Sequence, residues 1–198
     1  MTTIAVQTHL TPEEYLAWER KAPFKNEYLS GQILAMSGAS RAHNLITGNT
    51  FNGLYNQLVD RDCEVYTREM RVKANPITSY FYPDIVVVCD EPRFEDDAFD
   101  TLLNPTVVIE ILSPSTAAYD KGKKFESYKQ IESLQEYILI SQDRVNVERH
   151  LRLGTLWRAI EFQNLADILP LNSIRCELPL SHIYRRVRFT DISRPNLR

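Results

Sequence analysis

Two carboxylates lie within apolar strand sequences, and they constrain the fold more than any other feature of the chain. Asp84 directly precedes the run Ile85-Val-Val-Val88. Glu110 lies in the middle of the run Val107-Val-Ile-Glu-Ile-Leu112. A carboxylate in a buried strand is costly unless it is paired with a cation, hydrogen-bonded or bound to a metal. The fold must therefore bring a partner to each of these acids.

The two carboxylates converge if their strands are neighbours in one sheet. Side chains alternate between the faces of a strand, so Glu110 shares a face with Val108 and Leu112. Asp84 shares a face with Val86 for the same reason. Two carboxylates and a backbone carbonyl form an oxygen site suited to a hard cation such as Mg²⁺. For either acid alone, a buried ion pair or hydrogen-bonded carboxyl is an equal alternative.

A lysine-rich segment follows the second of these strands. Asp120 precedes it and is predicted to cap a helix over residues 121–133. Lys124 and Tyr128 lie one turn apart on one face of this helix. If that face looks towards the carboxylates, Lys124 can orient a water or stabilise negative charge developing on a phosphate. The other lysines are predicted to lie on a solvated face or to touch nucleic-acid backbone: Lys121, Lys123 and Lys129.

The remaining sequence alternates helix and strand signals. Thr11-Pro12-Glu13-Glu14 is a capping box with an early proline, which predicts a helix as far as about Lys21. Apolar residues at four-residue steps predict a second helix over residues 41–60. Two short strands joined by a Ser30–Gly31 turn are predicted within 27–36. Longer strands are predicted over 64–74, 80–89, 106–112, 136–141 and 144–152. Further strands and a short helix at 180–185 are predicted after them. This order predicts an α/β (α+β) fold around one sheet.

Length and composition indicate one globular domain. The chain has 198 residues, and its core is predicted over about 11–185 with short flexible tails. A net charge of −3 excludes a strongly basic nucleic-acid coat but not a local basic site. No apolar run approaches the roughly 20 residues that span a bilayer. The sparse cysteines predict a reducing, cytoplasmic compartment, with Cys63 and Cys89 as packing residues.

An ordered set of residues resembles a known family. The set comprises Glu27, His43-Asn44, Pro83-Asp84, the run Glu110-Ile-Leu-Ser-Pro-Ser-Thr116, Asp120 and Lys124-x-x-x-Tyr128. It is similar to the Uma-type restriction endonuclease family of the PD-(D/E)xK nuclease superfamily. The match runs from about Thr11 to Arg185. Its most specific part is the Pro-Asp strand followed by the Glu110 run and then Asp-x-x-x-Lys.

The resemblance implies a restriction-endonuclease-like fold, with a central mixed β-sheet flanked by helices, and a Mg²⁺- or Mn²⁺-dependent DNA endonuclease. Asp84 and Glu110 would be catalytic and hold the metal, with the Ile111 backbone carbonyl as a third ligand. The wider superfamily places a lysine where this chain has Leu112, and Lys124 is expected to replace it as the catalytic lysine. The resemblance also implies a homodimer. Supporting roles fall to Glu27, His43, Asp120, Tyr128 and Ser113.

Two alternatives to a nuclease remain open from the sequence. Because Leu112 stands at the usual lysine position, the chain can be an inactive nuclease-like fold that binds nucleic acid or a protein partner. It can also be a structural domain whose acids are paired internally. His43, at the start of a helix, is expected to contact a phosphate or the metal site, or to be structural.

Aromatic and basic residues near the predicted strands allow two interpretations. Four tyrosines can stack on bases or belong to the core: Tyr66, Tyr80, Tyr82 and Tyr119. Arg71 and Lys73 share a strand face and can meet backbone phosphate, whereas Arg68 points away from Arg71. A solvated sheet edge is the alternative for this basic group.

Overall fold

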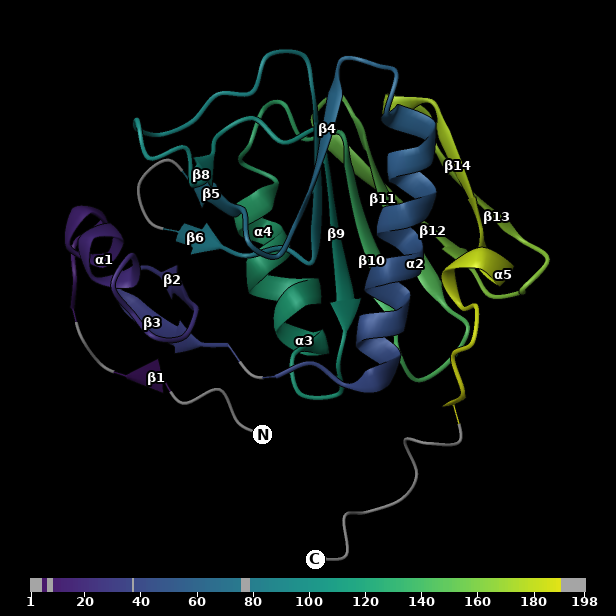
Figure 1. The fold of residues 1–198 in the computed structure, drawn as a ribbon, viewed down its shortest axis with the longest axis horizontal. Coiled ribbons are helices and arrows are strands. Elements are labelled where there is room, and N and C mark those ends of the chain that lie inside the picture. The colour runs from purple at the N-terminus through teal and green to yellow at the C-terminus, as the bar shows by residue number, and fades with distance from the viewer. Residues whose placement is uncertain (1–4, 7–8, 37, 76–78, 190–198) are drawn as a thin grey trace, which may run out of the picture.

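The computed structural model describes residues 5–6, 9–36, 38–75 and 79–189. Over these residues the chain builds two six-stranded sheets and a small two-stranded sheet (Figure 1). The predicted tails fall partly outside them. Where described, the tails are structured: Ala5–Val6 forms strand β1, and Val187 and Phe189 pack against the core. Regular structure and core packing thus extend beyond the predicted limits of 11–185.

The central sheet has the strand order β12-β11-β10-β9-β7-β4. Strands β9 and β10 pair in parallel and the other neighbours are antiparallel, so the sheet is mixed, as predicted. Its strands are β4 (Cys63–Thr67), β7 (Ile85–Cys89), β9 (Val107–Leu112), β10 (Glu136–Ser141), β11 (Val147–Leu153) and β12 (Leu156–Phe162). Strands β7 and β9 are neighbours, which fulfils the condition for Asp84 and Glu110 to converge.

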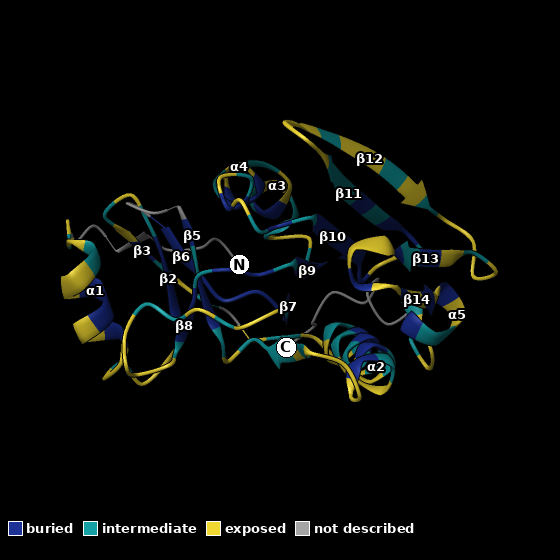
Figure 2. Cartoon of the chain, turned by 90° about the horizontal axis from the view of Figure 1, so that it is seen from above, coloured by how far each residue is buried: buried dark blue, intermediate teal, exposed yellow. Residues whose placement is uncertain are grey.

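Helices cover both faces of the central sheet. Helix α2 (Arg41–Leu58) lies on one face, and a three-part helix lies on the other (Figure 2). The three parts are α3 (Ala117–Tyr119), the π-helical turn η1 (Asp120–Lys124) and α4 (Phe125–Tyr128). Ile109 of β9 belongs to the apolar cluster of α2, whereas Val108 and Leu112 belong to the cluster of α4. Strand alternation therefore turns Glu110 towards the three-part helix.

The second sheet, called here the side sheet, has the order β1-β3-β2-β6-β5-β8. Helix α1 (Pro12–Glu19) covers it, and the predicted capping box of Thr11 and Glu14 is formed. Tyr15 of α1 packs with Tyr28 and Tyr80 of the sheet. The strands are β2 (Asn26–Leu29), β3 (Gln32–Ala35), β5 (Arg71–Asn75), β6 (Ser79–Phe81) and β8 (Thr101–Leu102).

The C-terminal part of the chain packs beside α2. It contains β13 (Ile168–Leu171), the short 3₁₀ turn η2 (Asn172–Ile174), β14 (Cys176–Pro179) and α5 (Leu180–Ile183). A Cβ atom on Gly53 of α2 would lie 2.6 Å from a methyl carbon of Leu178. A larger residue at this position would therefore force the Leu178 side chain to shift.

The prediction of one sheet was wrong because two predicted strands each divide between the two sheets. The predicted strand 64–74 divides into β4 and β5 at a turn around Arg68. The predicted strand 80–89 divides into β6 and β7 around Pro83, which has no N–H to donate to a ladder. Asp84 consequently lies where the chain passes from the side sheet to the central sheet.

The predicted helix over 121–133 was also displaced. Helical structure begins at Ala117, whose N–H donates to the Ser113 carbonyl, and it ends at Tyr128. Asp120 is therefore an interior helical residue and not the N-cap. Its carboxylate turns towards Lys124, four residues later.

Cys63 and Cys89 are not simple packing residues, because they form a disulfide. They face each other across the antiparallel pair β4–β7, with Cα atoms 4.1 Å apart. Cys176 is free and buried. In the described part of the chain, no helix is long and apolar enough to cross a membrane.

We predict that reducing this disulfide lowers the free energy of unfolding by about 3 kcal/mol, because it closes a loop between cysteines 26 residues apart. Denaturant unfolding with and without dithiothreitol measures the loss. The double variant Cys63→Ser, Cys89→Ser is the control, and its stability should not respond to the reductant. A wild type equally insensitive to reductant would contradict the prediction.

Candidate active site

A pocket of about 450 Å³ lies where the side sheet meets the central sheet. Its lining includes four acids that come from different elements. Glu27 belongs to β2, Asp84 precedes β7, Glu110 belongs to β9, and Asp120 lies in η1. Lys124, also in η1, lines the same pocket. The fold thus brings together the charged residues that the sequence singled out, and we call this site the acidic pocket.

The ammonium of Lys124 lies among three of these carboxylates. Its Nζ is 2.7 Å from Oε1 of Glu27, 2.8 Å from Oε1 of Glu110 and 3.8 Å from Oδ1 of Asp120. The Tyr128 hydroxyl donates a longer hydrogen bond of 3.4 Å to Oε1 of Glu110. Lys124 and Tyr128 therefore face the carboxylates, as their helical spacing predicted.

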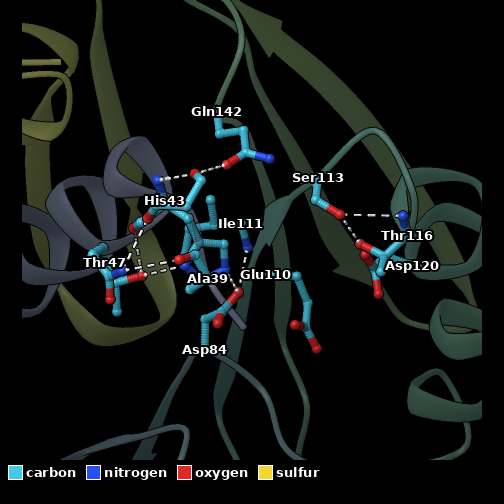
Figure 3. A network of polar contacts seen from close by, with 12 residues as sticks. Ala39, His43, Thr47, Asp84, Glu110, Ile111, Ser113, Thr116, Asp120 and Gln142 are labelled. Atoms are coloured by element: carbon cyan, nitrogen blue, oxygen red, sulfur yellow. Dashed lines mark hydrogen bonds and ion pairs between the residues drawn. The ribbon is translucent and has the colours of Figure 1, made fainter. Parts of the chain in front are cut away.

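Asp84 is held by a backbone amide and by a histidine. Its Oδ2 accepts the Ile111 N–H at 2.8 Å and lies 3.1 Å from Nε2 of His43 (Figure 3). In an extended strand the N–H and C=O of one residue point to the same side. The Ile111 carbonyl therefore lies on the edge of β9 that faces Asp84. Its predicted role as a metal ligand is compatible with this direction and stays a prediction.

The first turn of α2 positions His43. Ser40 caps this helix and accepts the His43 N–H at 3.0 Å. The Ser40 hydroxyl also donates to Oε1 of Gln142, a buried residue just after β10. Thr47 donates to the His43 carbonyl at 2.9 Å. His43 thus reaches Asp84 from a fixed helix terminus.

Negative charge exceeds positive charge in the buried part of the acidic pocket. Burial raises the pKa of Glu110 well above its usual value, the Lys124 charge opposes this, and the other acids add to it. Burial likewise raises the pKa of Asp120. Burial acts to lower the pKa of Lys124, but Glu110 and Glu27 outweigh it, and the pKa rises. Lys124 thus stays charged, and the surplus carboxylate charge calls for a proton or a further cation.

The residues of the acidic pocket fit a hard divalent cation. Among the described residues, the contacts of Asp84 use Oδ2 and those of Glu110 use Oε1, so the second oxygen of each remains available. The described residues hold no cluster of three or more His, Cys, Asp or Glu side chains placed to bind a metal. A donor set of two carboxylates and a carbonyl suits Mg²⁺, which usually keeps several waters.

Some predicted residues lie at the rim or outside the pocket. Ser113 lines the rim, where its Oγ lies 3.0 Å from Oγ1 of Thr116, so it shapes the turn before α3. Arg71 is buried beneath the side sheet, and Lys73 pairs with Glu95. Neither lines the pocket, and the burial of Arg71 contradicts the solvated sheet edge that was the alternative for it. Arg68, which was expected to point elsewhere, does line it.

Sequence reasoning missed three residues around the acidic pocket. Ser40 carried a visible signal, since a serine before a helical pattern predicts an N-cap. Gln142 carried none, because its contact with Ser40 depends on the packing of α2 against the end of β10. Thr47 contacts His43 within α2, one helical turn apart. Among the tyrosines proposed to stack on bases, Tyr82 and Tyr119 line the pocket, and Tyr80 is in the core.

Comparisons with known proteins identify a family and a fold for the chain. Residues 12–181 match the Uma2 family model, described as "Putative restriction endonuclease". Two uncharacterized proteins of Synechocystis sp. PCC 6803 are similar to this chain. The protein sll1609 is 39% identical, and the match covers 78% of this chain and 87% of sll1609. The protein slr1290 is 36% identical, and the match covers 91% of this chain and 94% of slr1290. The crystal structure of a "putative nuclease belonging to DUF820" from Anabaena variabilis has a TM-score of 0.72 at 22% identity, covering 88% of this chain and 97% of its own. That likeness confirms the fold.

The raised pKa of Glu110 predicts a pH-dependent stability. The folded state binds this proton more tightly than the unfolded state, whose value is about 4.5. The free energy of unfolding that Glu110 contributes is therefore highest below pH 4.5 and declines as the pH rises towards its folded pKa. We expect Glu110→Gln to remove this decline. The free energy of unfolding of the variant, compared with that of the wild type, should therefore increase with pH.

Denaturant unfolding in EDTA between about pH 4.5 and pH 8 measures this difference. The matched control is Glu132→Gln, an exposed glutamate beyond α4, which should retain the wild-type pH dependence. Parallel stability curves for the wild type and Glu110→Gln would show that Glu110 is not protonated more readily in the folded state.

Proposed function

The chain belongs to the Uma2 family ("Putative restriction endonuclease"), and from this premise we propose that it is a Mg²⁺- or Mn²⁺-dependent DNA endonuclease. The reaction is hydrolysis of a phosphodiester bond in the acidic pocket. One observation carries this proposal: the Lys124 ammonium lies 2.8 Å from Glu110, in the pocket that Asp84 also lines. Carboxylates that bind a cation and an ammonium that meets phosphate charge are the groups such a hydrolysis needs.

Asp84, Glu110 and the Ile111 carbonyl are the proposed metal-holding groups. When bound there, a divalent ion polarises a phosphoryl oxygen and lowers the pKa of water. Lys124 stays charged between its carboxylates and can donate a hydrogen bond to a phosphate oxygen as negative charge develops. His43 and Glu27 are positioning residues, because His43 orients Asp84 and Glu27 orients Lys124.

Lys124 comes from the helical turn η1 and not from strand β9, and this explains why position 112 can hold an apolar residue. Leu112 packs in the apolar cluster beneath α4, on the same face of β9 as Glu110. The ammonium reaches Glu110 from η1 instead, so the site needs no lysine on the strand. This supports an active site against the non-catalytic alternative. The homodimer and the cytoplasmic location stay predictions.

We predict that the purified protein nicks or linearises supercoiled plasmid in Mg²⁺ or Mn²⁺ and not in EDTA. Asp84→Asn should lower the rate about 100-fold or more, because loss of a metal-holding carboxylate forfeits several kcal/mol of transition-state stabilisation. Lys124→Ala should also abolish cleavage. Gel analysis of plasmid forms over time measures the rates.

The matched control is Asp90→Asn, at the opposite end of β7, where the side chain lies outside the acidic pocket. Asp90 has a positive φ of 68°, a conformation that asparagine tolerates. This variant should cleave at the wild-type rate. Cleavage that persists in EDTA or in Asp84→Asn would refute the proposal. Salt-dependent DNA binding without any turnover would favour the non-catalytic alternative.

A further inference from the structure

The reacting groups of the acidic pocket are nearly enclosed. The side chains of Asp84, Glu110 and Lys124 are 9%, 5% and 5% exposed. A phosphate must therefore enter the pocket to contact them. In a continuous duplex, each phosphate is fixed to a stiff double helix, whose persistence length is about 50 nm. A single strand is flexible enough to bring one phosphate inward.

Part of the pocket lining consists of apolar side chains that are not fully buried, and we call this part the apolar wall. Leu34 and Met36 belong to the end of the β2–β3 hairpin, and both line the pocket without full burial. Pro114 and Tyr119 line it from the segment that leads from β9 into α3. An apolar surface with an aromatic ring suits the flat face of a nucleobase.

Two cations line the same pocket. Arg68 lies in the turn between β4 and β5, and Lys123 lies in η1. Among the described residues, neither side chain forms an ion pair with a carboxylate, unlike Lys121 and Lys129 of the same helical region. If the phosphate of one nucleotide reaches the buried carboxylates and Lys124, the two neighbouring phosphates of the strand lie closer to the surface. Positive side chains there suit these neighbouring phosphates.

We propose that the acidic pocket takes one nucleotide of an unpaired DNA strand. The base lies against the apolar wall, the scissile phosphate reaches Lys124, and the flanking phosphates meet Arg68 and Lys123. The cavity of about 450 Å³ lies within the usual range for sites that enclose a small organic ligand. Paired DNA must first release a base at a cost of a few kcal/mol, so it is the poorer substrate. This inference rests on the proposed function and names its substrate class.

Binding and cleavage are tested on one DNA sequence, long enough to form a stable duplex, in three forms: single strand, perfect duplex, and duplex with a central unpaired bubble. With Asp84→Asn, fluorescence anisotropy in Mg²⁺ should show the single strand and the bubble bound at least about 10-fold more tightly than the duplex, because only the duplex must lose pairing. With the wild type, cleavage should fall within unpaired segments.

Two variants test the contacts in the Asp84→Asn background. Each phosphate that a cation neutralises adds about 0.7 to the slope of log K against log salt for a single strand. Arg68→Ala with Lys123→Ala should therefore lower this slope by about 1.4. Leu34→Ala should weaken single-strand binding several-fold and leave duplex binding unchanged. The matched control is Lys121→Ala, whose side chain pairs with Glu148 outside the pocket, and it should behave as the parent.

The inference and the proposed function fail in different ways. Equal or tighter binding of the duplex, or an unchanged salt slope in the Arg68→Ala, Lys123→Ala variant, would overturn the inference even if plasmid is cut. Another outcome is a protein that prefers single strands, with a preference that depends on Leu34 and Arg68, and yet cuts no DNA. That result would support the binding of an unpaired nucleotide in the pocket and refute the proposed endonuclease activity.

Discussion

A single buried ammonium connects the separate parts of this molecule. Lys124 extends from the helical segment between β9 and β10 and contacts Glu27 of the side sheet and Glu110 of the central sheet. Removing one partner of a buried ion pair typically costs about 3–5 kcal/mol, because an uncompensated charge is left behind. The junction of the two sheets therefore depends on the same contacts that form the acidic pocket.

The surplus of buried carboxylates in the acidic pocket is better explained by function than by stability. The four buried acids and Lys124 could together have been replaced by apolar side chains of similar size, and replacing a buried ionic cluster as a whole is often neutral or stabilising. Instead, burial and then the neighbouring acids raise the pKa values of Glu110 and Asp120. Perturbed ionisable groups of this kind gather at functional sites. If the proposed function holds, a bound cation would offset this surplus of carboxylate charge and stabilise the folded state.

The sequence predicted the mixed central sheet flanked by helices, and it predicted which charged residues gather in one pocket. Alternation along β9 brings Glu110 into the pocket that Asp84 lines because β7 and β9 are neighbours, and helical spacing places Lys124 with Tyr128. The division of 64–74 and 80–89 between two sheets could not be predicted from local pattern, because Pro83 marks a break but does not specify which strands pair on either side of it, and the partner strands come from elsewhere in the chain. The Cys63–Cys89 disulfide depends on the register of β4 with β7, which local pattern does not specify.

The π-helical turn at Asp120–Lys124 has a consequence for which changes the chain can accept. A π turn contains one residue more than the corresponding α-helical path. Because the extra residue is accommodated within the turn, deleting one residue between Asp120 and Lys124 would restore a regular helix and leave the segments on either side in place. Phe125 and Tyr128 would keep their positions in the apolar cluster, and Lys124 would follow Asp120 by three residues instead of four. A one-residue deletion should consequently be accepted more readily in this turn than in the regular helix α2, where it would rotate one end relative to the other by about 100°.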